Sequence, residues 1–202
     1  DAERDASMAR QVMAFIDERA ASPEPTMLFA FFKASHTGYH YPPDHAPFRP
    51  SRRLNPAIAD GADAGLYLND YRNALHYDDE LVGGILRLIE QRGLLANTIV
   101  IITSDHGESF DDNHTNDWGH GSNFTRSQVQ VPMVFYAPDR HPERIAYRTS
   151  HVDIAPTLLQ NVFGCVNEVQ DYSNGRNLFA APAGTRAFVV GSYVNHAYVL
   201  GE

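Results

Sequence analysis

The residues best suited to metal chemistry stand directly after a short apolar run. Ile99–Thr103 has the length and β-branched composition of a strand, and Asp105 and His106 follow it after Ser104. In an open α/β sheet, ligands bind where the chain leaves the carboxyl ends of the strands. An aspartate oxygen and an imidazole nitrogen at such a point predict a site for a divalent metal ion.

A third donor follows at loop distance. His120 comes 14 residues after His106, within the sequence Trp118-Gly-His-Gly121. Glycine favours backbone that must approach an ion closely, and Gly107 and the two glycines around His120 fit that role. A mixed oxygen and nitrogen donor set suits Zn²⁺ or Mn²⁺ better than Ca²⁺. We therefore expect Asp105, His106 and His120 to bind a metal that activates attack on a phosphoryl-type centre.

Two strands and the long helix between them should position these donors. Met27–Phe32 is a continuous apolar run that predicts a strand buried on both faces, and Tyr67 to about Gln91 has helical periodicity that Gly93 ends. Because a strand, a helix and a strand form a crossover, we expect Met27–Phe32 and Ile99–Thr103 to run parallel. The predicted apolar stripe of the helix is Tyr71, Leu75, Val82, Ile85, Leu86 and Ile89.

The remaining pattern is also that of an α/β protein. Residues 2–21 predict an amphipathic helix that Ser22-Pro-Glu-Pro25 ends, and the stretch from His36 to about Gly65 predicts a functional loop. A polar loop over 111–127 precedes the later elements. These are a strand over Val131–Tyr136, a helix over Ile154–Val162 capped by Asp153, and a hairpin of Ala187–Val194 with Ala197–Leu200.

Composition narrows the class of protein. The 202 residues can form one substantial core or a large piece of a bigger domain, and a net charge of −9 argues against a nucleic-acid partner. The single cysteine, Cys165, excludes an internal disulfide framework. The apolar stretches are strand-sized, and the chain opens in what resembles the middle of a helix. We expect one domain over residues 1–202 that is a fragment of a longer protein.

Several motifs resemble the alkaline phosphatase/sulfatase superfamily. The resemblance runs from about Met27 to Phe179 and is nearest to the envelope branch, which holds lipid phosphoethanolamine and phosphoglycerol transferases and the YejM (PbgA)-like inner-membrane group. It implies the C-terminal part of a three-layer α/β/α sandwich with a mostly parallel central sheet and a C-terminal hairpin. The motifs are Thr103-Ser-Asp-His-Gly-Glu108, Trp118-Gly-His-Gly121, Val131-Pro-Met-Val-Phe-Tyr136, His151-Val-Asp-Ile-Ala-Pro-Thr-Leu-Leu159 and the histidine-rich stretch His36–Phe48.

The resemblance implies roles for individual residues. Asp105 and His106 match metal ligands of the family, and His120 matches a histidine that faces the substrate or binds a second metal. His36 matches a histidine that lines the site, so His36 and His120 are the expected catalytic residues. We expect His36 to contact the substrate, and His40 either contacts it too or lies at the surface. Glu108 is expected beside the metal ligands.

The family's nucleophile and a further acidic ligand come from an earlier strand and helix. Nothing before Met27 supplies them, and Cys165 lacks the Cys-x-Pro-x-Arg context of a modified sulfatase cysteine. We therefore expect no nucleophile in this chain and little turnover by it alone.

The resemblance also implies a substrate class and a location. His106, where calcium sulfatases commonly have Asn, favours phosphate esters over sulfate esters and argues against a calcium arylsulfatase. A phosphate-ester or lipid head-group substrate is implied at the periplasmic face of the bacterial inner membrane, reached through an anchor outside this chain. The alternative is a non-catalytic domain that keeps the hydrolase fold and binds or regulates envelope lipid.

Overall fold

The computed structural model describes residues 2–22, 24–53, 63–121, 123–181, 184 and 186–200. Contacts divide the chain into two compact units, Asp1–Arg140 and His141–Glu202, and each is described by itself. The single sulfatase-like domain expected over residues 1–202 stays a prediction. Within the described residues, no helix combines the length and the hydrophobicity needed to cross a bilayer.

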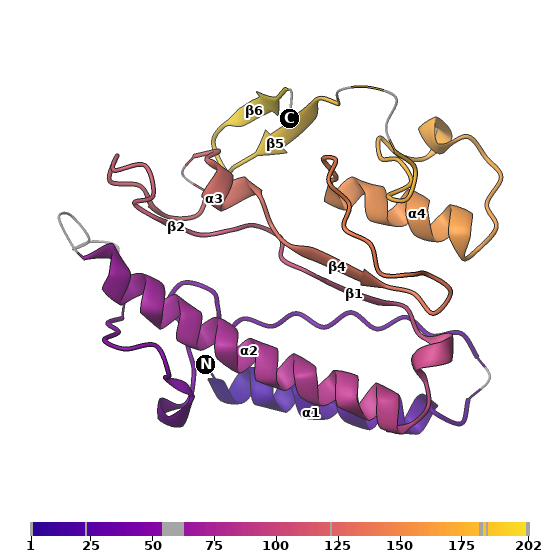
Figure 1. Ribbon diagram of the computed structural model, residues 1–202, viewed down its shortest axis with the longest axis horizontal. Helices are drawn as coiled ribbons and strands as arrows, with labels where there is room; N and C mark the ends of the chain where they lie inside the picture. Colours follow the sequence, from indigo (N-terminus) through magenta and orange to yellow (C-terminus); the bar gives the residue numbers. More distant parts are fainter. Residues whose placement is uncertain are drawn as a thin grey trace. The chain divides into compact units, whose positions relative to one another are not determined.

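Two helices form one layer of the first unit. α1 (Ala2–Arg19) and α2 (Ala64–Gln91) confirm the two predicted helices, and they lie side by side in Figure 1. They run in the same direction, because the first residue of α1 contacts the middle of α2, where the Tyr77 hydroxyl donates to the Ala2 carbonyl at 3.1 Å, and the ends of both helices also meet. Near their ends, Arg92 Nε donates to the Asp17 carboxylate at 2.7 Å.

The buried face of α2 differs from the predicted stripe. Leu75 is exposed, whereas Asp70 and Asn73 are buried together with apolar and tyrosine side chains. Asn73 accepts the Phe48 amide proton at 2.8 Å and donates to the Phe48 carbonyl at 3.1 Å. The polar face of α2 therefore binds the loop that precedes the helix. A search for apolar periodicity misses such a face, because its buried side chains are polar. The part of that predicted loop at residues 54–62 lies outside the described residues.

One sheet of the first unit is a pair of strands. β1 (Val100–Thr103) pairs antiparallel with β4 (Met133–Tyr136), which confirms both predicted strands. Met27–Phe32 forms no strand, however, and its parallel pairing with β1 was wrong. Every pairing among the described residues is antiparallel. An apolar run becomes a buried strand only where neighbours cover it, and here Met27 and Phe29 are exposed.

A short hairpin leads back to the helices. β2 (Ser109–Phe110) pairs antiparallel with β3 (Trp118–Gly119), and α3 (Arg126–Val129) follows. The hairpin packs on α2 through a buried cluster of Tyr39, Tyr67, Ala74 and Phe110, which Trp118 joins at its edge. Trp118 thus packs the hairpin against the helix. The described residues of this unit also form the short 3₁₀ helices η1 (Pro43–His45) and η3 (Leu95–Asn97).

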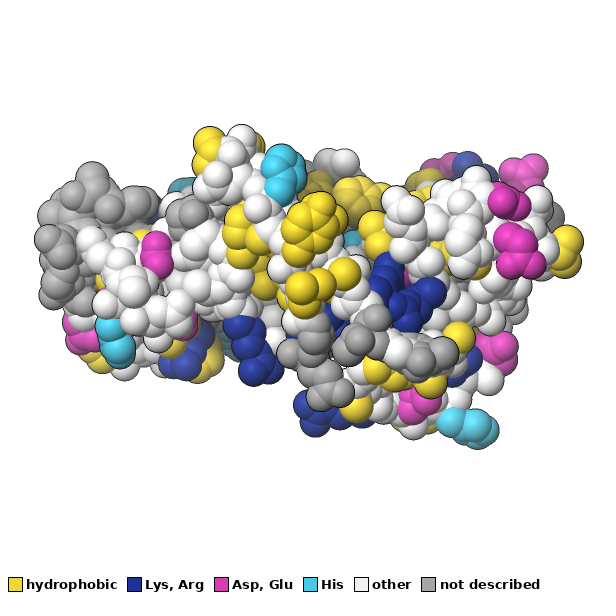
Figure 2. All heavy atoms as spheres, turned by 90° about the horizontal axis from the view of Figure 1, so that it is seen from above, with side chains coloured by type: hydrophobic (Ala, Val, Ile, Leu, Met, Phe, Trp, Pro, Cys, Tyr) yellow, Lys and Arg dark blue, Asp and Glu magenta, His cyan; other side chains and the backbone are white. Residues whose placement is uncertain are grey.

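The second unit is a short helix and a hairpin. η4 (His151–Asp153) leads into α4 (Ile154–Asn161), and η5 (Val169–Asp171) follows. β5 (Phe188–Gly191) and β6 (His196–Val199) pair antiparallel and confirm the predicted C-terminal hairpin. Hydrophobic side chains gather over this hairpin on the face seen in Figure 2. Exposed among the hairpin residues are Val189, Tyr193, Val194, Tyr198 and Leu200.

Asp153 has a different role from the predicted one. It precedes α4, but its carboxylate makes no capping hydrogen bond to that helix. The carboxylate instead accepts the amide proton of Ser150 at 2.8 Å, the amide proton of Arg176 at 2.9 Å and Arg186 Nη1 at 2.6 Å. Asp153 therefore ties together three segments of the second unit, two of them distant in the sequence.

Candidate metal centre

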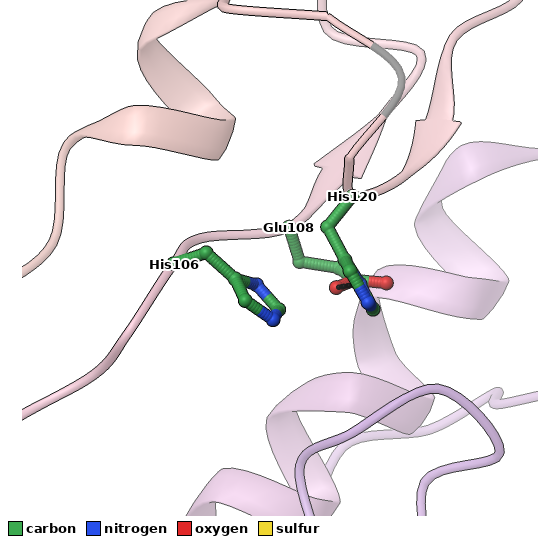
Figure 3. A group of neighbouring side chains, drawn as sticks. All are labelled: His106, Glu108 and His120. Atoms are coloured by element: carbon green, nitrogen blue, oxygen red, sulfur yellow. Dashed lines mark hydrogen bonds and ion pairs between the residues drawn. The ribbon is translucent and has the colours of Figure 1, made fainter. Parts of the chain in front are cut away.

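Two histidines and a glutamate meet where β1 leads into the β2–β3 hairpin. Donor atoms of His106, Glu108 and His120 lie within 4.8 Å of one another (Figure 3). His106 and Glu108 precede β2, and His120 follows β3, so the pairing of these two strands brings them together. Residues i and i+2 of an extended chain face the same side, which accounts for the shared direction of His106 and Glu108.

The two imidazoles are oriented alike. Their rings are stacked with centroids 4.0 Å apart and planes 25° from parallel, and both extend in the same direction in Figure 3. His106 Nδ1 lies 2.9 Å from the Gly107 carbonyl oxygen, and His120 Nδ1 lies 2.8 Å from Glu108 Oε2. Because both partners are acceptors, each Nδ1 donates a proton to its partner, and in a neutral imidazole the metal-binding lone pair is then on Nε2. Neutral imidazoles with an anchored Nδ1 are typical metal ligands.

Glu108 is held from the other side by two hydroxyl groups. Tyr39 donates to Oε1 at 3.0 Å and Thr37 donates to the same oxygen at 3.3 Å, and the Glu108 side chain is only 4% exposed. Burial, and then the charge of Glu108, raise the pKa of Tyr39, so that its phenol keeps the proton it donates. The sequence placed Glu108 beside the ligands, but it assigned no role to Thr37 and Tyr39, which lie about seventy residues earlier in the histidine-rich stretch that begins at His36.

His36 and Asp105 border this group. The His36 ring meets the His120 ring edge-on, with centroids 5.3 Å apart. Asp105 Oδ2 lies 3.7 Å from His106 Nε2, but the Asp105 side chain is 63% exposed and lies outside the group of three donors. The pocket beside them is lined by Phe31, Phe32, Ser35, His36, Tyr71, Asp105, His106, Gly107 and Glu108.

The structure does not bring His40 to this pocket. His40 is absent from the lining, and its amide donates to the Ala34 carbonyl at 2.9 Å. Burial, followed by the positive charges of Arg53 and Lys33, lowers the pKa of its imidazole. Neither of these cations lines the pocket, whereas His36 does, so the surroundings of His40 differ from those of His36.

Gly107 is required because the backbone of α3 packs closely against it, and not because it must approach an ion. A Cβ at this position would lie 2.0 Å from the Ser127 carbonyl oxygen, and the Gly107 amide donates to the Gln128 carbonyl at 2.8 Å. The glycine therefore lets the backbone of α3 approach the chain that carries the donors. Gly119 and Gly121 have φ values of +78° and +75°, so they serve the turn around His120.

One buried acid lies behind the pocket. Burial raises the pKa of Asp78, on α2, to about 6, although hydrogen bonds from Ser35 act in the opposite direction. Asp78 Oδ1 is buried with no hydrogen-bond partner among the described residues. The next residue after Ser35 is His36, so this acid borders the segment that carries a pocket histidine.

Comparison with known proteins shows which family the chain matches. Residues 2–164 match the family model described as Sulfatase. An uncharacterized protein of Haemophilus influenzae is 38% identical over 111 residues, which are 55% of this chain and 18% of that protein. The inner membrane protein YejM of Salmonella typhimurium is 27% identical over 130 residues, which are 64% of this chain and 21% of YejM.

A solved structure shows the same fold. YidJ from Bacteroides fragilis superposes with a TM-score of 0.65 at 21% identity, over 92% of this chain and 43% of that one. This confirms the expected α/β fold of the alkaline phosphatase/sulfatase superfamily, whose members use a divalent metal. The chain spans about a fifth of the length of the curated relatives it matches. Because the family model covers residues 2–164, most of the chain, this protein belongs to the sulfatase family.

Proposed function

We propose that this chain supplies metal ligands to the active site of a hydrolase or phosphotransferase that acts on phosphate esters. The observation that supports this is the pair of stacked imidazoles, His106 and His120, each anchored through Nδ1. Their Nε2 atoms, with the open carboxylate of Asp105 beside His106, suit Zn²⁺ or Mn²⁺ better than Ca²⁺. Such an ion, when bound, supplies Lewis acidity to the phosphoryl centre.

The pocket residues serve the substrate and the proton. His36 packs edge-on against His120 and lines the pocket, where an imidazole donates a proton to a leaving group or holds it. Phe31 and Phe32 form an apolar wall of the same pocket. His40 lies outside the pocket lining. It stays a predicted substrate contact, for a substrate that extends beyond this pocket.

A phosphate ester of an envelope lipid is the proposed substrate. His106 provides a nitrogen donor where calcium sulfatases commonly have Asn, and this favours a phosphate ester over a sulfate ester. The relative YejM is by name an inner membrane protein, and this supports an anchored protein whose domain acts on lipid head groups at the periplasmic face. The anchor and the nucleophile are then contributed by sequence outside this chain.

Metal content tests the proposal most directly. The chain is equilibrated with Zn²⁺ or Mn²⁺, dialysed, and its bound metal is measured by mass spectrometry. We expect stoichiometric metal in the wild type and loss of it in Asp105→Ala and His106→Ala. His114→Ala is the matched control, because that histidine is 91% exposed and lies outside the group of donors. A wild-type chain without metal contradicts the proposal.

Turnover tests the substrate class. The longer protein that contains this chain is assayed with an aryl phosphate and with the matching aryl sulfate, and we expect the phosphate to be hydrolysed faster. The 202-residue chain alone is expected to show little turnover. A faster reaction with the sulfate, or efficient catalysis by this chain alone, contradicts the corresponding part of the proposal.

A binding role is the second candidate. The observation that favours it is the position of Asp105, whose exposed carboxylate lies outside the group of three donors. A non-catalytic domain that keeps the hydrolase fold and binds envelope lipid has no need of a complete ligand set. Absence of metal from both the wild type and Asp105→Ala, together with binding to lipid vesicles, is the result expected for this candidate.

A further inference from the structure

We infer that Glu108 is a positioning residue for His120 and not a metal ligand, and that the hydroxyl groups of Thr37 and Tyr39 hold its carboxylate in place. This inference deepens the proposed function, and it rests on that proposal for the statement that the site binds a metal. The contacts that carry it are those of the Glu108 carboxylate with His120 (Figure 3) and with the hydroxyl groups of Tyr39 and Thr37.

Both oxygens of Glu108 are already committed. Oε1 accepts the hydroxyl protons of Tyr39 and Thr37, and Oε2 accepts the Nδ1 proton of His120 at 2.8 Å. The side chain is 4% exposed, so water does not compete for these positions. A carboxylate that turned toward an ion would leave the buried Tyr39 hydroxyl and the His120 proton without an acceptor, which is costly. Asp105 has no such commitments and is open to an ion.

The turn that delivers the two hydroxyl groups also carries His36. The Tyr39 amide donates to the His36 carbonyl at 2.9 Å and closes a tight turn. Gly38 and Tyr39 in this turn have φ values of +104° and +34°, and the second is unusual for a residue with a side chain. Backbone strain of this kind persists where the surroundings enforce it, as at binding sites. This one turn therefore positions His36, which it contains, and it also orients the His120 ring, because its two hydroxyl groups hold Glu108.

The tautomer of His120 tests the positioning role. The metal-free chain is labelled with ¹⁵N-histidine, and the ring nitrogens of His120 are observed by NMR at neutral pH. We expect the Nδ1–H tautomer to dominate in the wild type and to lose that dominance in Tyr39→Phe and in Glu108→Gln. Tyr67→Phe is the matched control: its ring belongs to the same buried cluster as Tyr39, but Tyr67 does not line the pocket and its hydroxyl is not among the described donors to Glu108.

Metal affinity distinguishes positioning from ligation. A positioning role predicts that Glu108→Gln weakens Zn²⁺ affinity about 10- to 100-fold and Tyr39→Phe weakens it less, with the stoichiometry unchanged. A ligand role predicts loss of the bound ion in Glu108→Gln and wild-type affinity in Tyr39→Phe. That second pattern overturns the inference. If Tyr39→Phe does not fold, Thr37→Val removes the other hydroxyl from a less buried position, and we expect a smaller change in the same direction.

The two proposals fail separately. If the wild-type chain binds no metal, the proposed function fails, while the tautomer measured in the metal-free chain still decides whether Glu108 orients His120. If His120 is found with its proton on Nε2, or if Tyr39→Phe matches Tyr67→Phe in both measurements, the positioning role is wrong even where metal binds.

Discussion

Two regions of the first unit differ in how fully their side chains are packed and hydrogen-bonded. Around Glu108, both carboxylate oxygens accept hydrogen bonds, and the neighbouring hairpin packs on α2 through a buried cluster that contains Tyr39 and Phe110. Along Met27–Phe32, by contrast, the chain is extended without strand pairing, and Met27 and Phe29 are 87% and 81% exposed.

The difference shows what each kind of interaction needs. Hydrogen bonds to a buried carboxylate are directional, so one turn and one hairpin are enough to define the Glu108 cluster. Hydrophobic burial is not directional and needs a covering surface, which the described residues do not provide along Met27–Phe32. A polar cluster is thus specified by a few contacts, whereas an apolar strand is specified by its neighbours.

The largest expected effect is on the packed side of this comparison. Phe110 is 6% exposed, and its ring lies 5.4 Å from that of Tyr71 and 6.2 Å from that of Tyr39. We expect Phe110→Ala to lower the free energy of unfolding by about 3 to 5 kcal/mol, because it leaves a cavity beneath the hairpin. Urea unfolding followed by circular dichroism measures it, and a loss below about 1 kcal/mol contradicts the packing.

The next effect concerns the two acidic residues at the candidate metal centre. Glu108→Ala leaves the buried Tyr39 hydroxyl and the His120 proton without an acceptor, and we expect a loss of about 3 kcal/mol in unfolding free energy. Asp105→Ala is the matched control, because its exposed carboxylate should change that free energy by less than about 0.5 kcal/mol. Equal losses in the two variants would remove the distinction between a held and an open carboxylate.

Asp78 gives an effect that depends on pH. Its pKa is raised from 3.8 to about 6 in the folded chain, so the folded state binds the proton more tightly than the unfolded state. The stability therefore falls as the pH rises from about 4 to about 6, by about 2 kcal/mol, and is constant in this respect above that range.

Asp78→Asn checks the sign of that effect. We expect the variant to lose most of the fall in stability between about pH 4 and about pH 6, because the amide carries no charge to desolvate. The measurement is the midpoint of urea unfolding across that range. Equal pH dependence in the wild type and in Asp78→Asn is incompatible with the burial of Asp78.

The smallest effect belongs to the exposed segment. Phe29 is 81% exposed, so Phe29→Ala should change the unfolding free energy by less than about 0.5 kcal/mol. The same urea series measures it beside Phe110→Ala. A loss above about 2 kcal/mol shows that the apolar segment is covered in solution and removes the contrast between the two regions.

The site was predictable from sequence only in part. His106 and His120 lie together as their spacing and the glycine-bracketed loop indicated, because a strand end and a short hairpin are local features. Tyr39 and Thr37 were not predictable, since no periodicity links them to Glu108 across about seventy residues. The same holds for Asp153, whose partner Arg186 lies 33 residues away.

By itself, the sequence determined the helices α1 and α2, the strands β1 and β4 and the C-terminal hairpin, because each is encoded in a local period. It also determined the donor types at His106 and His120. Only the tertiary structure decided that Met27–Phe32 stays unpaired and that Glu108 is held by Tyr39 and Thr37. Strand pairing and buried hydrogen bonds depend on which distant segments meet, and that depends on how the whole chain packs.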